Sequence, residues 1–314
     1  MEAKDFRAFV EQLGSLTNVQ RDAILEAIRA GASATSAVAL IDARFAIAPQ
    51  CGHCRSNNVR PWSKPDPIRR YMCDACGKTF TALTGTPLQT LRRRDAWLEY
   101  ARCLGDGIPL RKAAKRCGIA LDTSFRWRHR FIETPKDVKA ETLSGIVEAD
   151  ETFILKSQKG ARAVMGRDPR KRGGKASKPG KSSEYQPVLI ARDRTGATTD
   201  VMLDAVDSAS ITSHLGGVVR GQAVLITDGE KAYAELAETY ALLHVWIIAS
   251  KGEHVWQGFH IQNVNAYTSN LKRWMVRFRG VATKYLDSYL GWRRMIDRDG
   301  DDLPAERWLY AAVA

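Results

Sequence analysis

At 314 residues, the chain is long enough for two or three modules and at least one sizeable hydrophobic core. Its formal net charge of +13 favours a polyanionic partner, either nucleic acid or an anionic membrane surface. No apolar run approaches the roughly 18 residues of a membrane-spanning helix, and the N-terminus lacks the pattern of a secretory signal. We therefore expect a cytoplasmic protein without a membrane partner, in which cysteines stay reduced.

Residues 1–45 are expected to form a helical segment that serves in packing or positioning. Thr17 and Gln20 have the spacing of a capping box, which marks the start of a helix. Gly31 is suited to end that helix, because glycine adopts the left-handed conformation of a C-terminal cap at little cost.

Residues 46–86 are polar and rich in turns, and they hold four of the six cysteines in the pattern C-x2-C-x18-C-x2-C. In a reducing compartment such pairs are metal ligands rather than disulfides. Zinc prefers four ligands in a tetrahedron, and each pair can present two thiolates to one ion. The spacing predicts a zinc ribbon with one structural zinc ion, and an iron–sulfur site is the alternative. The expected ligands are Cys51, Cys54, Cys73 and Cys76.

The zinc ribbon has two possible roles. Arginines around the cysteines, Arg70 among them, favour contact with nucleic acid. The alternative is that the ion only stabilises a segment that could hardly fold alone.

Residues 87–135 are very basic and predict a helix-turn-helix. Ala114 is followed four residues later by Gly118, which matches a small residue in the first helix and a glycine in the turn. Asp122 is expected to cap the second helix. The side chains expected to pack inward from that helix are Leu121, Phe125 and Ile132.

The outward face of the second helix is expected to enter the major groove of DNA. A preceding run of arginines adds charge that neutralises phosphates. A basic helical hairpin with solvated arginines is the alternative. The expected DNA contacts are Thr123, Arg126, Trp127 and Arg130, together with Arg92, Arg93 and Arg94.

Residues 143–155 are rich in β-branched and aromatic residues and predict a strand. The basic, glycine-rich segment 156–182 is expected to be a flexible insertion that tracks DNA or is simply solvated. Two strand-like runs around a turn at 194–196 follow, then a short helix, a buried strand that ends at Asp228, and another helix. Residues 263–298 are again expected to be helical.

Two acidic residues stand where metal ligands are useful. Asp150 lies inside the apolar strand, with Glu148 on the same face two residues earlier. A carboxylate inside a strand is unusual unless it is paired or binds a metal. Asp228 directly follows a buried strand. On adjacent strands, Asp150 and Asp228 could hold two divalent ions that activate water or a 3′-hydroxyl in phosphoryl transfer.

The order of elements between residues 143 and 240 is that of a ribonuclease-H-like core. The chain resembles bacterial insertion-sequence transposases of the DDE type, in the ISXO-type group with an N-terminal zinc ribbon. The resemblance covers nearly the whole chain and rests on "VEADETF", "ITDGEKAY" and "HIQNVNAYTSNLKRWMVRFRGVATKYL". It implies that Asp150 and Asp228 are metal ligands. It further implies that Asn265 takes the place of the third ligand, often Glu, with Lys272 as the basic residue seven positions later.

The residues of the third motif agree with a catalytic helix. Asn265 and Lys272 are two helical turns apart and share a face, so Lys272 is expected to clamp a phosphate. The amide oxygen of Asn265 can bind Mg²⁺, but it brings no negative charge. Glu148 is expected to supply the missing charge, with Glu151 or Glu230 as alternatives. A basic surface helix with an incidental asparagine is the alternative. Further expected contacts are Arg273 and Arg277 to the DNA backbone and His260 to a phosphate or water.

Together these features predict a multidomain chain whose main fold is an α/β ribonuclease-H-like core with a mixed sheet. The expected boundaries are 1–45 for the helical segment, 46–86 for the zinc ribbon, 87–135 for the helix-turn-helix, 143–298 for the catalytic core and 299–314 for a C-terminal tail.

The resemblance implies a transposase that binds terminal inverted repeats and acts on double-stranded DNA as a homo-oligomer. Two catalytic Mg²⁺ ions would support strand cleavage and transfer into target DNA. The alternatives are an inactive, transposase-derived DNA-binding regulator and a two-metal nuclease without strand transfer.

Overall fold

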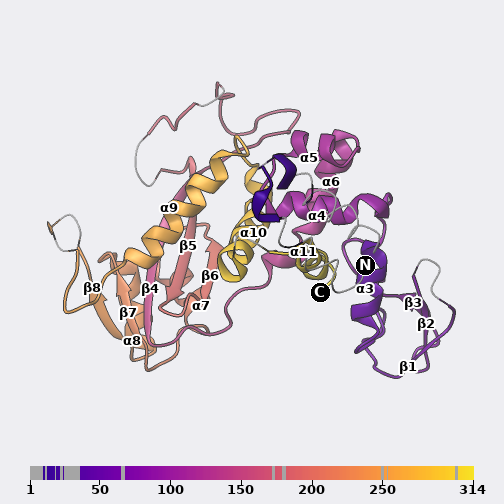
Figure 1. Ribbon diagram of the computed structural model, residues 1–314. Coiled ribbons are helices and arrows are strands. Elements are labelled where there is room, and N and C mark those ends of the chain that lie inside the picture. The colour runs from indigo at the N-terminus through magenta and orange to yellow at the C-terminus, as the bar shows by residue number, and fades with distance from the viewer. Residues whose placement is uncertain are drawn as a thin grey trace. The chain divides into compact units, whose positions relative to one another are not determined.

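The computed structural model describes residues 10, 13–17, 19–21, 24, 36–64, 68–171, 174–178, 182–248, 251–252, 254–300 and 303–314 (Figure 1). The chain divides into two compact units, residues 1–101 and 102–312, and the division falls inside the segment 87–135. Among the described residues, no helix combines the length and apolarity needed to cross a membrane.

The N-terminal segment shows the predicted capping box. The Gln20 backbone N–H donates to Thr17 Oγ1 (3.4 Å), and the Thr17 N–H donates to Gln20 Oε1 (2.9 Å). Gly31, the predicted end of this helix, lies outside the described residues. The short helix η1 (Leu13–Ser15) precedes the box, and α3 (Ala37–Phe45) follows, capped by the Ser36 hydroxyl.

The first unit contains a small antiparallel sheet in the order β1-β2-β3. Its core consists of Cys51, Tyr71, Cys73 and Phe80, against which Phe45 of α3 packs. The rings of Tyr71 and Phe80 stack with their centroids 5.7 Å apart. So few buried side chains make a marginal core, which a metal ion can stabilise. The strands are β1 (Val59–Pro61), β2 (Arg70–Cys73) and β3 (Thr79–Thr81), and η2 (Arg94–Ala96) follows them.

Helix α4 (Trp97–Gly105) spans the division, and a pair of helices follows it in the second unit. The pair consists of α5 (Leu110–Arg116) and α6 (Leu121–Phe131), joined by the turn at 117–120. Gly118 in this turn has φ +59°, a left-handed conformation that favours glycine. The Ser124 hydroxyl donates to the Leu110 carbonyl (3.1 Å) and ties the two helices together.

A five-stranded mixed sheet in the order β6-β5-β4-β7-β8 forms the centre of the second unit. Neighbouring strands from β6 to β4 are antiparallel, whereas β4, β7 and β8 are parallel. This mixed sheet with its helices fits a ribonuclease-H-like core, as the sequence predicts. The strands are β4 (Ile146–Leu155), β5 (Tyr185–Asp193), β6 (Thr198–Met202), β7 (Val224–Thr227) and β8 (Leu243–Trp246).

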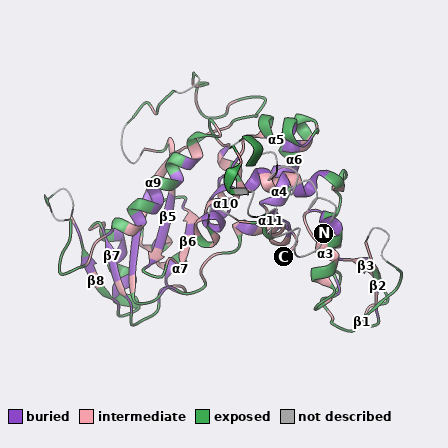
Figure 2. Cartoon of the chain, in the orientation of Figure 1, coloured by how far each residue is buried: buried purple, intermediate pink, exposed green. Residues whose placement is uncertain are grey.

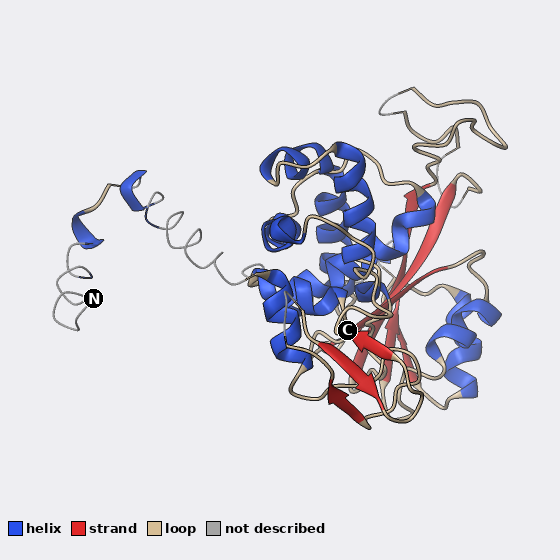
Figure 3. Ribbon diagram, turned by 90° about the vertical axis from the view of Figure 1, so that its right-hand side faces the viewer, coloured by secondary structure: helices blue, strands red, loops and turns tan. Residues whose placement is uncertain are grey.

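Helices cover both faces of this sheet (Figures 1 and 3). On one face, Val147 and Ala149 of β4 pack with Ile211 of α7 and Leu236 of α8. On the other face, α9 lies across β4 and β5. Side chains at odd and even positions of β4 therefore face different helices. The helices of the sheet are α7 (Ser208–Leu215), η4 (Lys231–Tyr233), α8 (Ala234–Thr239) and α9 (Gln262–Val276).

The C-terminal segment packs into the second unit rather than forming the predicted tail. It contains α11, whose Trp308 and Leu309 are fully buried. Apolar side chains at helical spacing give α11 one buried side. The remaining elements are η3 (Thr134–Lys136), η6 (Thr283–Tyr285), α10 (Leu286–Asp299) and α11 (Ala305–Ala312).

A buried ion pair connects α10 to β6. The Arg294 side chain is 4% exposed, and its guanidinium donates to Asp200, whose side chain is fully buried. It also donates to the Lys136 carbonyl (2.6 Å), so one side chain links α10, β6 and the end of η3. Burial raises the pKa of Asp200, and the charge of Arg294 opposes that rise.

We expect Arg294→Met to lower the free energy of unfolding by about 3–5 kcal/mol at pH 7, because it leaves Asp200 buried without its partner. The pKa of Asp200 would then rise further, so the folded state would bind a proton more tightly than the unfolded state. The variant should therefore regain stability as the pH falls from 7 towards 5. Urea unfolding at the two pH values measures this.

Arg298→Met on the same helix is the matched control, since Arg298 pairs with Asp299 at the surface and should contribute at most about 1 kcal/mol. Adding Asp200→Asn to Arg294→Met should restore part of the loss. Equal losses for the two arginine variants would contradict the prediction.

Candidate catalytic site and zinc cluster

Asp150 lies in β4, and Asp228 directly follows the parallel neighbouring strand β7. The register of β4 and β7 pairs Glu148 with Ile226, and each aspartate is two residues further along its own chain. Two residues return the side chain to the same face of a strand, so both aspartates lie on the face that carries α9. Asp150 is half-buried and Asp228 is exposed, as expected for groups that reach a ligand from solvent.

Tyr233 is a buried tyrosine whose hydroxyl is influenced by three acidic residues. Burial raises the pKa of its hydroxyl well above the usual value, and the negative charges of Glu151, Asp150 and Asp228 add to the rise. The Tyr233 hydroxyl donates to Glu151, which points to the opposite face of β4 from Asp150. Glu151 is therefore engaged away from α9, and it is a poor substitute for the charge that Asn265 lacks.

Glu148 binds the N-terminus of α9. Its side chain is fully buried, and Oε2 accepts the backbone N–H groups of Asn263 (2.7 Å) and Val264 (3.0 Å). Oε1 accepts the Asn263 side-chain amide (3.0 Å) and faces Arg194 Nε (3.2 Å) and His260 Nδ1 (3.5 Å). A carboxylate at this position satisfies unpaired N–H groups and complements the positive end of the helix dipole.

This arrangement corrects the predicted role of Glu148. Both carboxylate oxygens are already engaged by protein donors, so the residue anchors α9 instead of offsetting the missing charge of Asn265. Glu148 lies on the face of β4 that its sequence position predicts, but the helix that begins there is far away in the chain. Arg194, in the turn after β5, was not identified as part of the site. Its signal was faint, a basic residue in a turn, although it also donates to His260 Nε2 (3.0 Å).

Asn265 lies in the first turn of α9, one residue after the Val264 N–H that binds Glu148. Its own N–H donates to the Ile261 carbonyl (3.1 Å), and its side chain is exposed. Lys272, two turns along, is also exposed. The helix packs through another side that is buried, formed by Val264, Tyr267, Thr268, Leu271 and Trp274. The anchor thus holds the turn that carries Asn265 against β4, two residues before Asp150.

The four predicted zinc ligands come together in the first unit. Their sulfur atoms all lie within 4.8 Å of one another, with Cys51 Sγ 3.7 Å from Cys76 Sγ and Cys54 Sγ 3.6 Å from Cys73 Sγ. A tetrahedron with Zn–S bonds of about 2.3 Å has sulfur–sulfur edges of roughly 3.8 Å, so the cluster fits one zinc ion. His53 faces the Thr79 carbonyl (3.4 Å) and is not part of the cluster.

The predicted DNA-contacting face of α6 is partly wrong. Trp127 is 2% exposed and packs near Phe131, whereas Phe125, expected to be inside, is 39% exposed. The helix begins at Leu121 after Ala120 without a side-chain cap, so Asp122 is not its N-cap. The buried set Ser124, Trp127, Arg128 and Phe131 has the spacing of one helical side and fixes the rotation of the helix.

Arg128 belongs to this buried side. Its side chain is fully buried, and its guanidinium lies over the ring of Trp292 (4.7 Å) and donates to the Ile108 carbonyl (2.6 Å). Of the predicted DNA contacts on α6, Arg126 and Arg130 remain exposed and Thr123 is half-buried. Arg130 also pairs with Glu133 (3.2 Å).

The other predicted DNA contacts are basic side chains with local partners. Arg92 is exposed, Arg93 pairs with Asp95 (2.9 Å), and Arg94 lies over the ring of Trp97 (5.8 Å). On α9, Arg273 and Arg277 are both exposed. Arg273 donates to the Asn270 side chain (3.0 Å), and Arg277 lies 6.0 Å from the ring centre of Trp274.

The described residues of the basic insertion are attached to the core by several hydrogen bonds, among them a reciprocal pair between the Ser157 backbone and Thr283. Lys159 Nζ donates to the carbonyls of Phe278 (3.2 Å), Arg279 (3.3 Å) and Gly280 (2.7 Å), just after α9. Elsewhere, Glu184 accepts hydrogen bonds from Ser177 and Arg170, which lower its pKa to about 2. The insertion therefore contacts the chain just after the C-terminal end of α9, and Glu148 binds the N-terminal end of the same helix.

Comparison with known proteins agrees with this geometry. Residues 142–293 match the family model of the ISXO2-like transposase domain. The chain is also 26% identical over 246 residues to a protein of Halobacterium salinarum described as an "uncharacterized protein in transposable element ISH50". That similarity covers 76% of this chain and 82% of the relative.

Two solved structures give weaker similarity. One is the simian T-cell lymphotropic virus intasome in complex with the PP2A regulatory subunit B56 gamma, with 11% identity, coverage of 63% of this chain and 68% of that chain, and a TM-score of 0.29. The other is the pre-cleavage Mos1 transpososome, with 14% identity, coverage of 68% and 76%, and a TM-score of 0.24. The domain match and the relative confirm the resemblance to insertion-sequence transposases, and residues 142–293 carry it.

Proposed function

We propose that the chain is a transposase that binds the terminal inverted repeats of its element, cleaves DNA strands at their ends and transfers them into target DNA. The observation that supports the proposal is the parallel pairing of β4, which contains Asp150, with β7, which Asp228 directly follows, and the attachment of the first turn of α9 to Glu148 of β4. That turn supplies Asn265. Together these residues offer two carboxylates and an amide oxygen on one face of the sheet.

This donor set suits Mg²⁺, which prefers oxygen ligands and keeps several waters. Asp150, Asp228 and Asn265 would hold two ions, which supply activation of the attacking oxygen and stabilisation of the leaving oxygen. Lys272, exposed two turns after Asn265, would hold a phosphate next to the reacting group. His260, placed by Arg194, would orient the DNA backbone at the start of α9.

DNA binding in this proposal rests on the excess of basic residues and on the two N-terminal modules. The net charge of +13 supplies long-range attraction to DNA. Arg126 and Thr123 of α6 and the zinc ribbon would recognise the repeat, and Arg92, Arg93 and Arg94 would contact phosphates. Because strand transfer joins two element ends to one target, we propose that the chain acts as a homo-oligomer on DNA.

The test uses end-labelled double-stranded DNA that carries the repeats flanking the gene, with a supercoiled plasmid as target and Mg²⁺ present. We expect labelled strands joined covalently to the plasmid, and no products when EDTA replaces Mg²⁺. Cleaved strands without joining would identify a two-metal nuclease. Specific binding of the repeat without cleavage would identify a DNA-binding regulator. DNA with a scrambled repeat is the matched control.

A further inference from the structure

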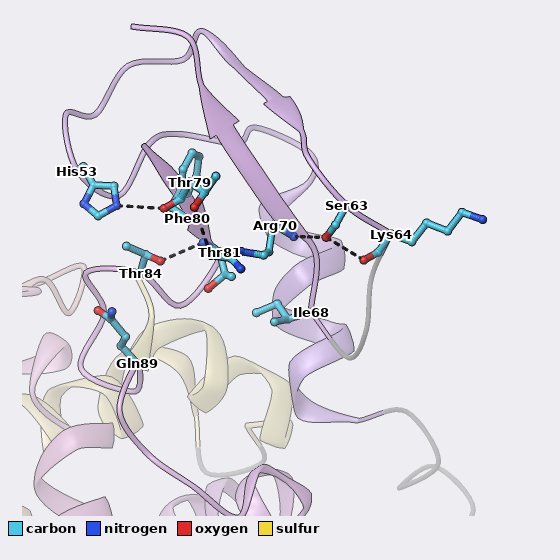
Figure 4. A pocket seen from close by; sticks show the side chains of 10 residues that line it. All are labelled: His53, Ser63, Lys64, Ile68, Arg70, Thr79, Phe80, Thr81, Thr84 and Gln89. Carbon is cyan, nitrogen blue, oxygen red and sulfur yellow. Dashed lines mark hydrogen bonds between the residues drawn. The ribbon is translucent and has the colours of Figure 1, made fainter. Parts of the chain in front are cut away.

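A hollow of about 580 Å³ opens on the zinc ribbon (Figure 4). We call it the ribbon pocket. Its lining residues come from the first knuckle, the loop before β2, strands β2 and β3, and the segment after β3. All of them belong to the first unit, so the first unit alone forms the pocket. The volume lies within the range of pockets that hold a small ligand group.

The pocket is lined by positive and hydroxyl groups. Arg70 and Lys64 are both exposed, and the Lys64 side chain extends away from the other lining residues (Figure 4). Ser63, Thr79 and Thr84 bring hydroxyls. Among the described residues that line it, none is acidic. Such a combination favours an anion with several acceptor oxygens, because each oxygen can take a charge-assisted or hydroxyl hydrogen bond.

Arg70 is held in place at the pocket by both its main chain and its side chain. Its guanidinium Nη2 lies 3.3 Å from Thr79 Oγ1 on β3, and its backbone N–H donates to Ser63 Oγ (3.4 Å). The Ser63 hydroxyl in turn donates to the Lys64 carbonyl (3.1 Å). Arg70 and Lys64 therefore lie on neighbouring, hydrogen-bonded segments (Figure 4). A guanidinium fixed in this way loses less rotamer entropy when it binds an anion.

The pocket also has apolar groups. Ile68 and Phe80 line it beside the cations. A backbone phosphate of DNA is flanked by deoxyribose, which is largely apolar, so a phosphate with its neighbouring sugar matches both kinds of lining. A free inorganic anion would use the cations and hydroxyls but not these side chains.

We propose that the ribbon pocket binds one backbone phosphate of the terminal-repeat DNA, with Arg70 as its main charged partner and Lys64 joining it by rotation of its exposed side chain. The zinc ion then has a role beyond stability, because Cys73 lies in the same strand as Arg70 and the ion fixes that strand. The contact positions the protein on the duplex without reading its sequence. This inference rests on the proposed function, since it takes the repeat DNA as the partner.

The first test measures repeat binding by the full chain with zinc, using fluorescence anisotropy. Arg70→Gln should weaken binding roughly tenfold near physiological salt and reduce the slope of log affinity against log salt by about one. Lys64→Gln should act in the same direction. Lys78→Gln is the matched control, because Lys78 is an exposed cation of the same ribbon that does not line the pocket. It should change affinity less than about twofold.

The second test locates the phosphate. A series of repeat DNAs, each with one uncharged methylphosphonate linkage, is titrated with the wild-type protein and with Arg70→Gln. At one linkage, the methylphosphonate should lower the affinity of the wild type by about the same factor as Arg70→Gln lowers the affinity for unmodified DNA. The same methylphosphonate should not lower the affinity of Arg70→Gln any further. Inorganic phosphate, a free anion without a sugar, should displace the labelled repeat DNA only weakly.

The inference is overturned if Arg70→Gln and Lys78→Gln weaken DNA binding equally. It is also overturned if, at every linkage, the affinity loss from the methylphosphonate multiplies with the loss from Arg70→Gln. Zinc content and circular dichroism establish that each variant is folded, and Lys64→Gln decides the matter if Arg70→Gln loses zinc. Failure of the wild type to prefer the repeat over scrambled DNA contradicts the proposed function itself. Normal binding and cleavage by Arg70→Gln contradicts only the ribbon pocket.

Discussion

Asp228→Asn is expected to abolish Mg²⁺-dependent cleavage of element ends while leaving the affinity for the same DNA unchanged or slightly higher. The substitution keeps the shape of the side chain but removes a charge that two divalent ions would need. Loss of several kcal/mol of transition-state stabilisation corresponds to a rate at least about 10³ lower. Because Asp228 is exposed after β7, the fold should be unaffected.

The measurement pairs single-turnover cleavage of end-labelled repeat DNA with anisotropy of the same DNA. Asp204→Asn is the control, since Asp204 is another exposed acid of the second unit, in the loop after β6. It should cleave at the wild-type rate. Cleavage by Asp228→Asn at the wild-type rate would place the chemistry elsewhere, and an equal fall in binding would show that the effect is not on the chemical step.

The parts of the site that could be predicted from the sequence depend on local rules. Four cysteines in two C-x-x-C pairs meet because each knuckle is formed by adjacent residues. Asp150 and Asp228 are expected on one face of the sheet because strand side chains alternate with a period of two and the parallel neighbours β4 and β7 keep their register. Figure 2 shows this core largely buried, as strands rich in β-branched residues suggest.

The parts that could not be predicted depend on partners far away in the chain. Arg128 of α6 is buried and its guanidinium lies over Trp292 in α10, so the apolar residues near α6 alone predicted the wrong side for Trp127 and Phe125. A buried arginine is rare and gives no local signal. The role of Glu148 also depends on a distant partner. An acidic residue in a strand suggests a metal ligand, unless it is known that the N-terminus of a helix such as α9 lies on it.

Glu148→Gln is expected to affect both stability and chemistry. The buried carboxylate accepts two backbone N–H groups of α9 and the Asn263 amide, and it faces the charge of Arg194. A glutamine would turn an NH₂ group towards some of these donors and leave Arg194 without its counter-ion. Hydrogen bonds to a charged group are worth about 1.5–3 kcal/mol, so we expect a loss of about 3 kcal/mol in urea unfolding.

The chemical effect separates anchoring from mere stability. If the start of α9 shifts by about 1 Å, Asn265 no longer lies where Asp150 and Asp228 need it, and the cleavage rate should fall roughly 10²-fold even under conditions where the variant is fully folded. Arg294→Met, which is expected to cost as much stability through contacts of α10, provides the control. At low temperature it should cleave normally. Mn²⁺ binding, measured by titration calorimetry, should weaken in Glu148→Gln and not in Arg294→Met. Equal behaviour of the two variants in rate and in metal affinity would mean that Glu148 contributes only to folding, and that the position of α9 is set by its buried side.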